Sequence, residues 1–331
     1  MEHALELRNV RKTFGATLAV DAVSLAVPRG ALCGVIGPSG AGKTTCIRMV
    51  MSILFPDSGS VSVLGHASAL EAKDRIGYLP EERGVYRKMR VGAFLTYMGQ
   101  LKGVRTEEAA ARVPRLLAEV GLGGTEGTRC DELSKGMLQR VQFVAAILHE
   151  PELLILDEPF SGLDPVSVRL LREQMLRAHA RGTTILLSTH IMQYAEDLCE
   201  HVFMIHQGRK VLDQAMAGMR RQFDPRTITF EPLDPSADVG VVRAMPDVER
   251  LDRVETTAGG YTVTLAEGTD PSVVLARIAA AVPPARIEMA RLRLEDVFIR
   301  IVAGGGGLDE ATAALRSRLQ SGAAEAEGVR A

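Results

Sequence analysis

One stretch constrains the fold more than any other part of the sequence: it contains Gly37, Pro38, Ser39, Gly40, Ala41, Gly42, Lys43 and Thr44. These residues fit the pattern G-x-x-x-x-G-K-[ST] in full, between a strand-like run, ALCGVI, and a helix-like run, CIRMVMSIL. Glycines allow such a loop to wrap around an anion with its N–H groups pointing inward, and the helix N-terminus adds a favourable dipole. The pattern therefore predicts that a nucleoside triphosphate binds here.

Three side chains at the end of this loop are candidates for contacts with the nucleotide. Lys43 is expected to reach the β- and γ-phosphates, and the Thr44 hydroxyl is expected to bind Mg²⁺. Thr45 is a further candidate for a phosphate contact. The alternative is a glycine-rich turn that contains a lysine by chance. The strand-like run before the loop and the helix-like run after it favour the nucleotide.

A pair of acidic residues follows the apolar run LLIL. Asp157 ends this predicted strand, and its side chain is expected to emerge beside the phosphate loop in a parallel sheet and to hold Mg²⁺. Glu158 points differently and is a candidate to polarise the attacking water. An Asp-Glu pair after a strand can also be a helix cap or a solvated turn. The upstream phosphate loop favours the catalytic interpretation.

Composition narrows the class of protein. The chain has 331 residues and a formal net charge of −2, which gives no large basic surface for nucleic acid. Its four cysteines stand alone, as is typical of reduced thiols in a cytosolic protein. The charged N-terminus does not resemble a signal peptide, and no apolar run approaches the ~20 residues that a membrane helix needs. We therefore expect a cytoplasmic protein, which a partner would hold if it works at a membrane.

The pattern of predicted elements divides the chain into three parts. Residues 1–218 alternate strands and helices, which predicts an α/β domain with a parallel sheet and a helical insert at about 85–150. Residues 219–303 predict a small α+β domain. Residues 304–331 begin with a run of glycines and are expected to form a flexible tail.

The segment LSKGMLQR carries a resemblance to a known family. Ser134 can cap a helix, but Ser-Lys-Gly with Gly136, shortly before the acidic strand, resembles the signature of the ATP-binding cassette (ABC) ATPases. Four further likenesses follow the order of that family. Phe14 in KTFG resembles the aromatic residue that stacks on adenine, and Glu81 lies in the Q-loop region. Asp164 in SGLD matches the D-loop, and His190 matches the switch histidine. Two positions depart from the usual signature, Lys135 and Met137, and Glu81 stands where the family usually has glutamine.

Within that family, the chain resembles the ATPase subunits of type-two ABC exporters, which include sodium-extrusion and drug-resistance ATPases. The resemblance implies a P-loop NTPase fold with a helical subdomain, with ATP and Mg²⁺ as cofactors. It implies a dimer of two cassettes, with an identical second chain expected, in which Ser134 and Gly136 of one chain cover the ATP of the other. Glu158 and His190 would then be the catalytic residues.

The resemblance also implies a membrane permease as partner, which would place the protein on the inner face of the cell membrane. Arg83, Tyr86 and Met89 are candidates for contact with it, and a plain solvated loop is the alternative. The rival function is a soluble ABC ATPase acting on ribosomes or nucleic acid. A single phosphate loop, no coiled-coil heptads and a near-neutral charge argue against this rival.

Overall fold

The computed structural model describes residues 2–82, 84–222, 226–254, 260–290 and 293–303. The expected flexible tail at 304–331 and Arg83 lie outside these residues. The chain divides into two units, Met1–Met216 and Ala217–Ala331. Each of them has a hydrophobic core of its own. None of the helices in the described ranges is both long enough and apolar enough to cross a membrane.

A six-stranded sheet forms the centre of the first unit. Its strands, in spatial order, are β5 (Ile76–Leu79), β6 (Leu153–Asp157), β7 (Thr184–Thr189), β3 (Leu32–Ile36), β8 (His201–His206) and β9 (Arg209–Ala215). All neighbours pair in parallel except β8 and β9, which are antiparallel. Every residue of β3, β6 and β7 is buried, and this explains their unbroken apolar runs. The expected parallel sheet is present.

A separate three-stranded sheet contains the first two strands of the chain. β1 (His3–Phe14) pairs antiparallel with β2 (Thr17–Pro28) and with β4 (Ser58–Val63). Its core-facing residues alternate with outward-facing ones along part of β2, as expected of a sheet with one covered face. Residues from this sheet and from the six-stranded sheet share one hydrophobic core.

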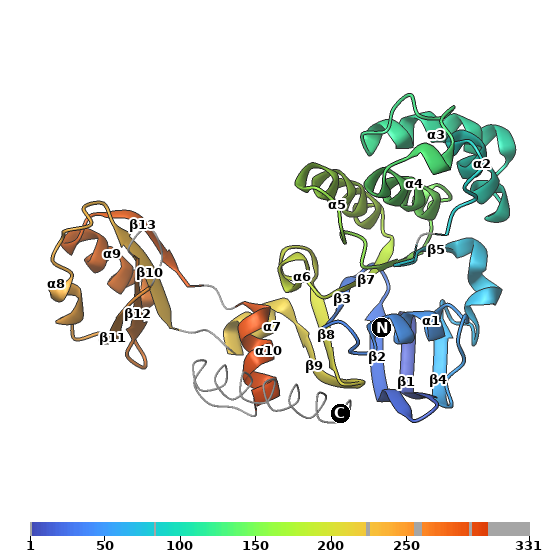
Figure 1. Cartoon of the computed structure of the whole chain (residues 1–331). Helices are drawn as coiled ribbons and strands as arrows, with labels where there is room; N and C mark the ends of the chain where they lie inside the picture. Colours follow the sequence, from blue (N-terminus) through green and yellow to red (C-terminus); the bar gives the residue numbers. More distant parts are fainter. Residues whose placement is uncertain (1, 83, 223–225, 255–259, 291–292, 304–331) are drawn as a thin grey trace, which may run out of the picture. The chain divides into compact units, whose positions relative to one another are not determined.

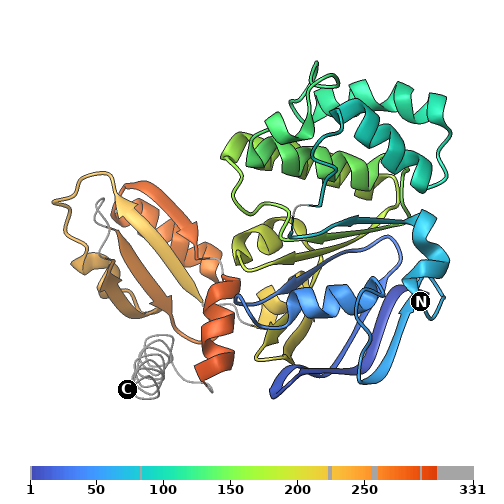
Figure 2. The same ribbon diagram turned by 45° about the vertical axis from the view of Figure 1, so that its right-hand side comes forward.

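Helices cover the six-stranded sheet and form the insert between β5 and β6. They are α1 (Lys43–Val50), α2 (Val91–Leu101), α3 (Thr106–Glu119), α4 (Lys135–Ile147), α5 (Pro165–Ala180) and α6 (Met192–Leu198), with the 3₁₀ segments Ala69–Arg75 and Cys130–Glu132. A further helix, α7 (Met216–Gln222), belongs to the second unit from its second residue on. α2, α3 and α4 pack against one another (Figure 1). The same group is seen from a second direction, above the strands, in Figure 2.

The first helix is shorter than its apolar pattern suggests. The sequence predicts a helix from Lys43 to about Leu54, but α1 ends at Val50. Ser52 adopts a left-handed backbone conformation (φ 55°), which an α-helix cannot include. α5 begins as its sequence predicts, with Asp164 as N-cap and Pro165 in the first turn.

The second unit contains a four-stranded antiparallel sheet in the order β11-β12-β10-β13. Its elements are β10 (Thr227–Pro232), α8 (Gly240–Arg243), β11 (Val248–Arg253), β12 (Tyr261–Leu265), α9 (Pro271–Ala281), β13 (Pro284–Met289) and α10 (Leu294–Ala303). The succession from β10 to β13 is β-α-β-β-α-β, a known split arrangement. Phe230 and Val263 on the sheet share a core with Val274 and Ile278 on α9.

Phe230→Ala tests this second core. Because Phe230 is fully buried, the change should lower the free energy of unfolding of this unit by about 3–5 kcal/mol. Hydrogen exchange of the amides in β10 and β12 would measure the loss. Val273→Ala, at an exposed position of α9, is the control and should change it by less than about 0.5 kcal/mol. Equal protection in Phe230→Ala and the parent chain would contradict the assignment of the core.

Candidate nucleotide site

The phosphate loop connects β3 to α1 and is shaped by close backbone contacts. A Cβ atom on Gly37 would lie 2.1 Å from the Ile205 carbonyl oxygen, and one on Gly42 would lie 2.6 Å from the Ala19 carbonyl oxygen. Both glycines also have positive φ, 150° and 107°, so only glycine fits at either position. Gly42 is the N-cap of α1, and no side chain caps that helix. The first N–H groups of α1 are therefore available to an anion.

Lys43 is buried and held by its own loop. Its Nζ donates to the Gly37 oxygen at 2.8 Å and to the Pro38 oxygen at 3.1 Å. It also lies 3.5 Å from Oε1 of Glu158. Ser39 and Gly40 form the exposed tip of the loop. The loop thus keeps a cation directed inward, where a phosphate would meet it.

Asp157 and Thr44 meet at the end of β6. Oδ1 of Asp157 lies 3.3 Å from the Thr44 hydroxyl and accepts a hydrogen bond from Ser188. Its other oxygen, Oδ2, is buried without a hydrogen-bond partner in the described part of the chain. Oε2 of Glu81 lies 3.4 Å from the same hydroxyl. A hydroxyl, an unpartnered buried carboxylate oxygen and a second carboxylate are the oxygen ligands that Mg²⁺ prefers, so these residues fit that ion.

The environment of Asp157 disfavours its negative charge. Burial raises the pKa of the Asp157 carboxyl, and the neighbouring carboxylates of Glu81 and Glu158 raise it further. Hydrogen bonds from Ser188 and Thr44 oppose this shift. A bound cation would favour the charged form and reverse the effect.

Glu158 lies at a sharp turn directly after β6. Its backbone is left-handed, with φ 50°, and its N–H donates to the Ser188 carbonyl oxygen at 3.2 Å and to the Ser188 hydroxyl at 3.1 Å. The side chain is 7% exposed, and its Oε2 lies 2.9 Å from Nδ1 of His190. The structure therefore brings Lys43, Glu158 and His190 into one cluster.

Two predicted residues of the signature segment lie apart from this cluster. Ser134 is the N-cap of α4, and its hydroxyl accepts from the Met137 N–H at 3.2 Å. It is exposed, and a Cβ atom on Gly136 would lie 3.3 Å from the side chain of Leu163. Within the described ranges, no hydrogen bond or ion pair joins either residue to Lys43 or Glu158.

Three other predicted residues also lie outside the cluster. Phe14 is exposed at the end of β1, with Nζ of Lys12 at 5.7 Å from its ring centre. The carboxylate of Asp164 accepts from the N–H groups of Val166 and Ser167, so it is occupied as a helix cap. Thr45 is partly buried in the first turn of α1.

The sequence analysis missed Ser188, which binds both Asp157 and Glu158. Its Oγ donates to Asp157 and accepts from the Glu158 N–H. Ser188 is two residues before His190, at the carboxyl end of β7, where the ends of the parallel strands gather. That spacing is the signal in the sequence that could have identified it.

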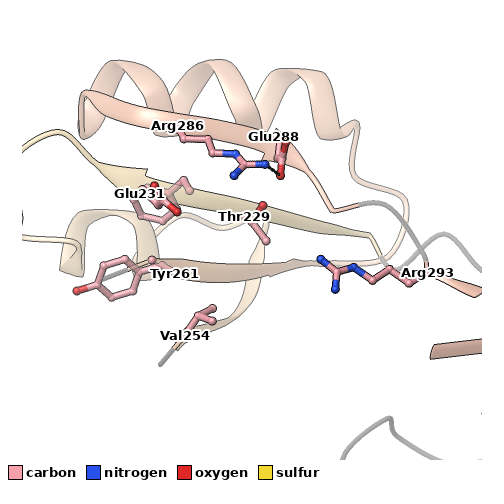
Figure 3. Close-up of a pocket in the computed structure, with 9 residues that line it drawn as sticks. Thr229, Glu231, Val254, Tyr261, Arg286, Glu288 and Arg293 are labelled. Atoms are coloured by element: carbon pink, nitrogen blue, oxygen red, sulfur yellow. Dashed lines mark hydrogen bonds and ion pairs between the residues drawn. The ribbon is translucent and has the colours of Figure 1, made fainter. Parts of the chain in front are cut away.

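A hollow of about 240 Å³ lies in the second unit. The close-up in Figure 3 shows Thr229 and Glu231 on β10, with Arg286 and Glu288 above them and Arg293 at one end. Arg286 and Glu288 form an ion pair at 2.8 Å. Among the described residues that line the hollow, two are acidic, two are basic and one is a glycine, a lining that does not suit a triphosphate.

Asp157→Asn should raise the thermal midpoint of the first unit when Mg²⁺ is absent. A carboxyl whose pKa is higher in the folded than in the unfolded chain stabilises the folded state at low pH and loses that contribution as the pH rises. The increase in thermal midpoint caused by Asp157→Asn should therefore be larger at about pH 7 than at about pH 4. Thermal melts at both pH values measure this.

Asp164→Asn is the control, because the pKa of Asp164 is shifted in the opposite direction from that of Asp157. The hydrogen bond from Ser167 lowers the pKa of Asp164, so its carboxylate stabilises the folded state at neutral pH and loses that effect as the pH falls. Asp164→Asn should not raise the midpoint at about pH 7. A lower midpoint for Asp157→Asn than for the parent chain at that pH would contradict the account of Asp157.

Comparisons with known proteins identify the family. The family described as ABC transporter matches residues 20–161. The ABC transporter ATP-binding protein YhaQ of Bacillus subtilis (strain 168) is 36% identical over 298 residues, which cover 90% of this chain and 98% of that protein. The Nod factor export ATP-binding protein I of Rhizobium sp. (strain N33) is 32% identical over 302 residues, 90% of this chain and 96% of that protein.

A solved structure shows the same fold. It is the ATP-binding subunit of an ABC transporter, with a TM-score of 0.62 and 34% identity, over 66% of this chain and 93% of that chain. The predicted fold, a P-loop NTPase cassette, is confirmed. With similarity along nine-tenths of its length to YhaQ, the chain belongs to the family of ABC transporter ATP-binding proteins.

Proposed function

We propose that this chain is the ATP-hydrolysing subunit of an exporter and that it drives a separate membrane permease. The observation that carries the proposal is the position of Glu158, a buried carboxylate between Lys43 and His190. A carboxylate in this setting can act as a general base toward a water molecule beside the γ-phosphate. The name of a relative, Nod factor export ATP-binding protein I, supports export as the direction.

The phosphate loop would hold the nucleotide through groups that are already directed inward. The N–H groups from Gly37 to Thr45 and the α1 dipole would bind the phosphates, and Lys43 would exchange its contact with Glu158 for the β- and γ-phosphates. Thr44 and Asp157 would hold Mg²⁺, with Glu81 beside them. When bound, Mg²⁺ neutralises charge that develops on the transferred phosphoryl group.

Glu158 and His190 would share the chemical step. Once a phosphate binds Lys43 and replaces its contact with Glu158, the Glu158 carboxylate is free to accept a proton from the attacking water. His190 would fix the orientation of Glu158 through their 2.9 Å contact and would also meet the γ-phosphate. Hydrolysis removes the γ-phosphate, and with it the contacts that would hold two chains together in a closed dimer.

The exposed start of α4 supports a head-to-tail dimer. The Ser134 hydroxyl and the N–H groups near Gly136 would bind the γ-phosphate held by an identical second chain. Phe14 would stack on adenine from its exposed position, and Asp164 would meet the partner at the D-loop. Nucleic acid has no part in this proposal.

The permease is proposed to contact the helical insert, which would place the protein at the inner face of the membrane. Tyr86 is 54% exposed, and its ring lies 5.8 Å from that of Tyr97 and 6.4 Å from that of Phe94. Exposed aromatic side chains that pack together are typical of protein interfaces. Met89 donates its backbone N–H to the Tyr86 oxygen, so it belongs to the same turn.

Glu158→Gln tests the assignment of the general base. The purified variant should bind ATP as the parent chain does, because the phosphate loop is intact. It should hydrolyse ATP about 10²–10⁴-fold more slowly, the usual effect of losing a general base. Equilibrium titration and steady-state phosphate release measure the two quantities.

Glu152→Gln is the matched control for this substitution. Glu152 precedes the opposite end of β6 and forms surface ion pairs with Arg75 and Arg29. Its variant should hydrolyse ATP at the rate of the parent chain, because exposed ion pairs contribute little. Similar turnover in Glu158→Gln and Glu152→Gln would exclude Glu158 as the base.

A further inference from the structure

Gln139 connects α4 to the turn that carries Glu158. It lies in the second turn of the helix and is 7% exposed. Its Nε2 donates to the Pro159 carbonyl oxygen at 2.6 Å and lies 3.4 Å from the Glu158 carbonyl oxygen. Its Oε1 is buried without a partner in the described ranges, so the amide is held through its NH₂ group alone.

The turn at Glu158 requires support from its surroundings. A glutamate with φ 50° is in a sparsely populated conformation, and such residues persist only where neighbouring groups fix them. Ser188 on β7 binds the Glu158 N–H from one side. Gln139 binds the carbonyl groups that follow from the other side. The direction of the Glu158 side chain therefore depends on both anchors.

Gln139 differs from Ser188 because Ser134, the residue proposed to contact the second chain's nucleotide, is the N-cap of its helix, α4. Ser134 caps α4 five residues before Gln139, a rise of about 7.5 Å along one rigid helix. A second contact joins the same parts, because Leu163 lies against Gly136. The segment from Glu158 to Leu163 is thus attached to α4 at both ends, by Gln139 and by Gly136.

We propose that Gln139 is a positioning residue that couples the two ATP sites of the dimer. This inference rests on the proposed function, in which Ser134 binds the nucleotide of the second chain. When Ser134 engages that nucleotide, α4 shifts as a unit, and Gln139 carries the shift to the Glu158 turn of its own chain. Each catalytic carboxylate is then set by the nucleotide at the opposite site.

The test uses the full chain and measures ATP hydrolysis against ATP concentration. The parent should give a Hill coefficient above 1, with an upper limit of 2 for two coupled sites. Gln139→Met keeps the length of the side chain but removes the donor. It should lower kcat by about 10–100-fold and bring the Hill coefficient close to 1, because the carboxylate loses its link to the opposite site. Its ATP affinity at equilibrium should be that of the parent.

Gln142→Met is the matched control. Gln142 lies on the same helix and is 6% exposed, and no hydrogen bond joins it to the Glu158 turn within the described residues. Its variant should keep both the kcat and the Hill coefficient of the parent. Ser188→Ala removes the hydroxyl of the opposite anchor and leaves its carbonyl oxygen, so it should lower kcat while the Hill coefficient stays above 1.

The outcomes separate this inference from the function on which it rests. A parent chain that does not hydrolyse ATP contradicts the proposed function. A parent that hydrolyses ATP with a Hill coefficient of 1, or a Gln139→Met variant that keeps the Hill coefficient of the parent, overturns the role of Gln139 alone. If Gln139→Met does not fold, Gln139→Asn takes its place, because its amide is one methylene shorter and falls short of the Pro159 oxygen, and an unchanged Hill coefficient in that variant overturns the role of Gln139.

Discussion

Parallel pairing of β6, β7 and β3 is the constraint on which the site depends. These strands are buried along their whole length, so both faces of the sheet are covered, and they pair in one direction. Their carboxyl ends therefore meet at one edge of the sheet. The phosphate loop follows β3, Asp157 and Glu158 lie at the end of β6, and His190 follows β7. Backbone hydrogen bonds between these strands therefore bring side chains from three distant parts of the sequence together.

The same arrangement of strands brings the charged side chains of Lys43 and Glu158 into contact. Lys43 donates to two carbonyl oxygens of its own loop and lies beside Glu158, which contacts His190. A buried cation and a buried carboxylate stabilise each other, since either would be costly alone. A triphosphate would compete with Glu158 for Lys43. In the proposed function, binding of ATP is in this way connected to release of the Glu158 carboxylate.

The sequence predicts the cluster around the phosphate loop well because a strict pattern specifies it. Gly37 and Gly42 meet backbone atoms that exclude any side chain, so the pattern follows from geometry. Asp157 was predicted because an acid after an unbroken apolar run marks the end of a buried strand. The end of α1 and the roles of Ser188 and Gln139 were not predicted. The end of α1 depends on a left-handed turn at Ser52, and the contact of Gln139 joins elements far apart in the chain, which no local pattern encodes. For Ser188 the one signal was its short spacing from His190.

In the proposed dimer two chains complete each ATP site, so association of the chains should require ATP. Sedimentation of Glu158→Gln with Mg²⁺ and ATP should show a dimer, since hydrolysis no longer reopens it. Adding Ser134→Arg in that background places bulk and charge at the exposed start of α4 and should leave a monomer that still binds ATP. Ser134→Thr, which keeps the hydroxyl, should leave the dimer intact. A dimer of undiminished stability in the Ser134→Arg variant would contradict the account.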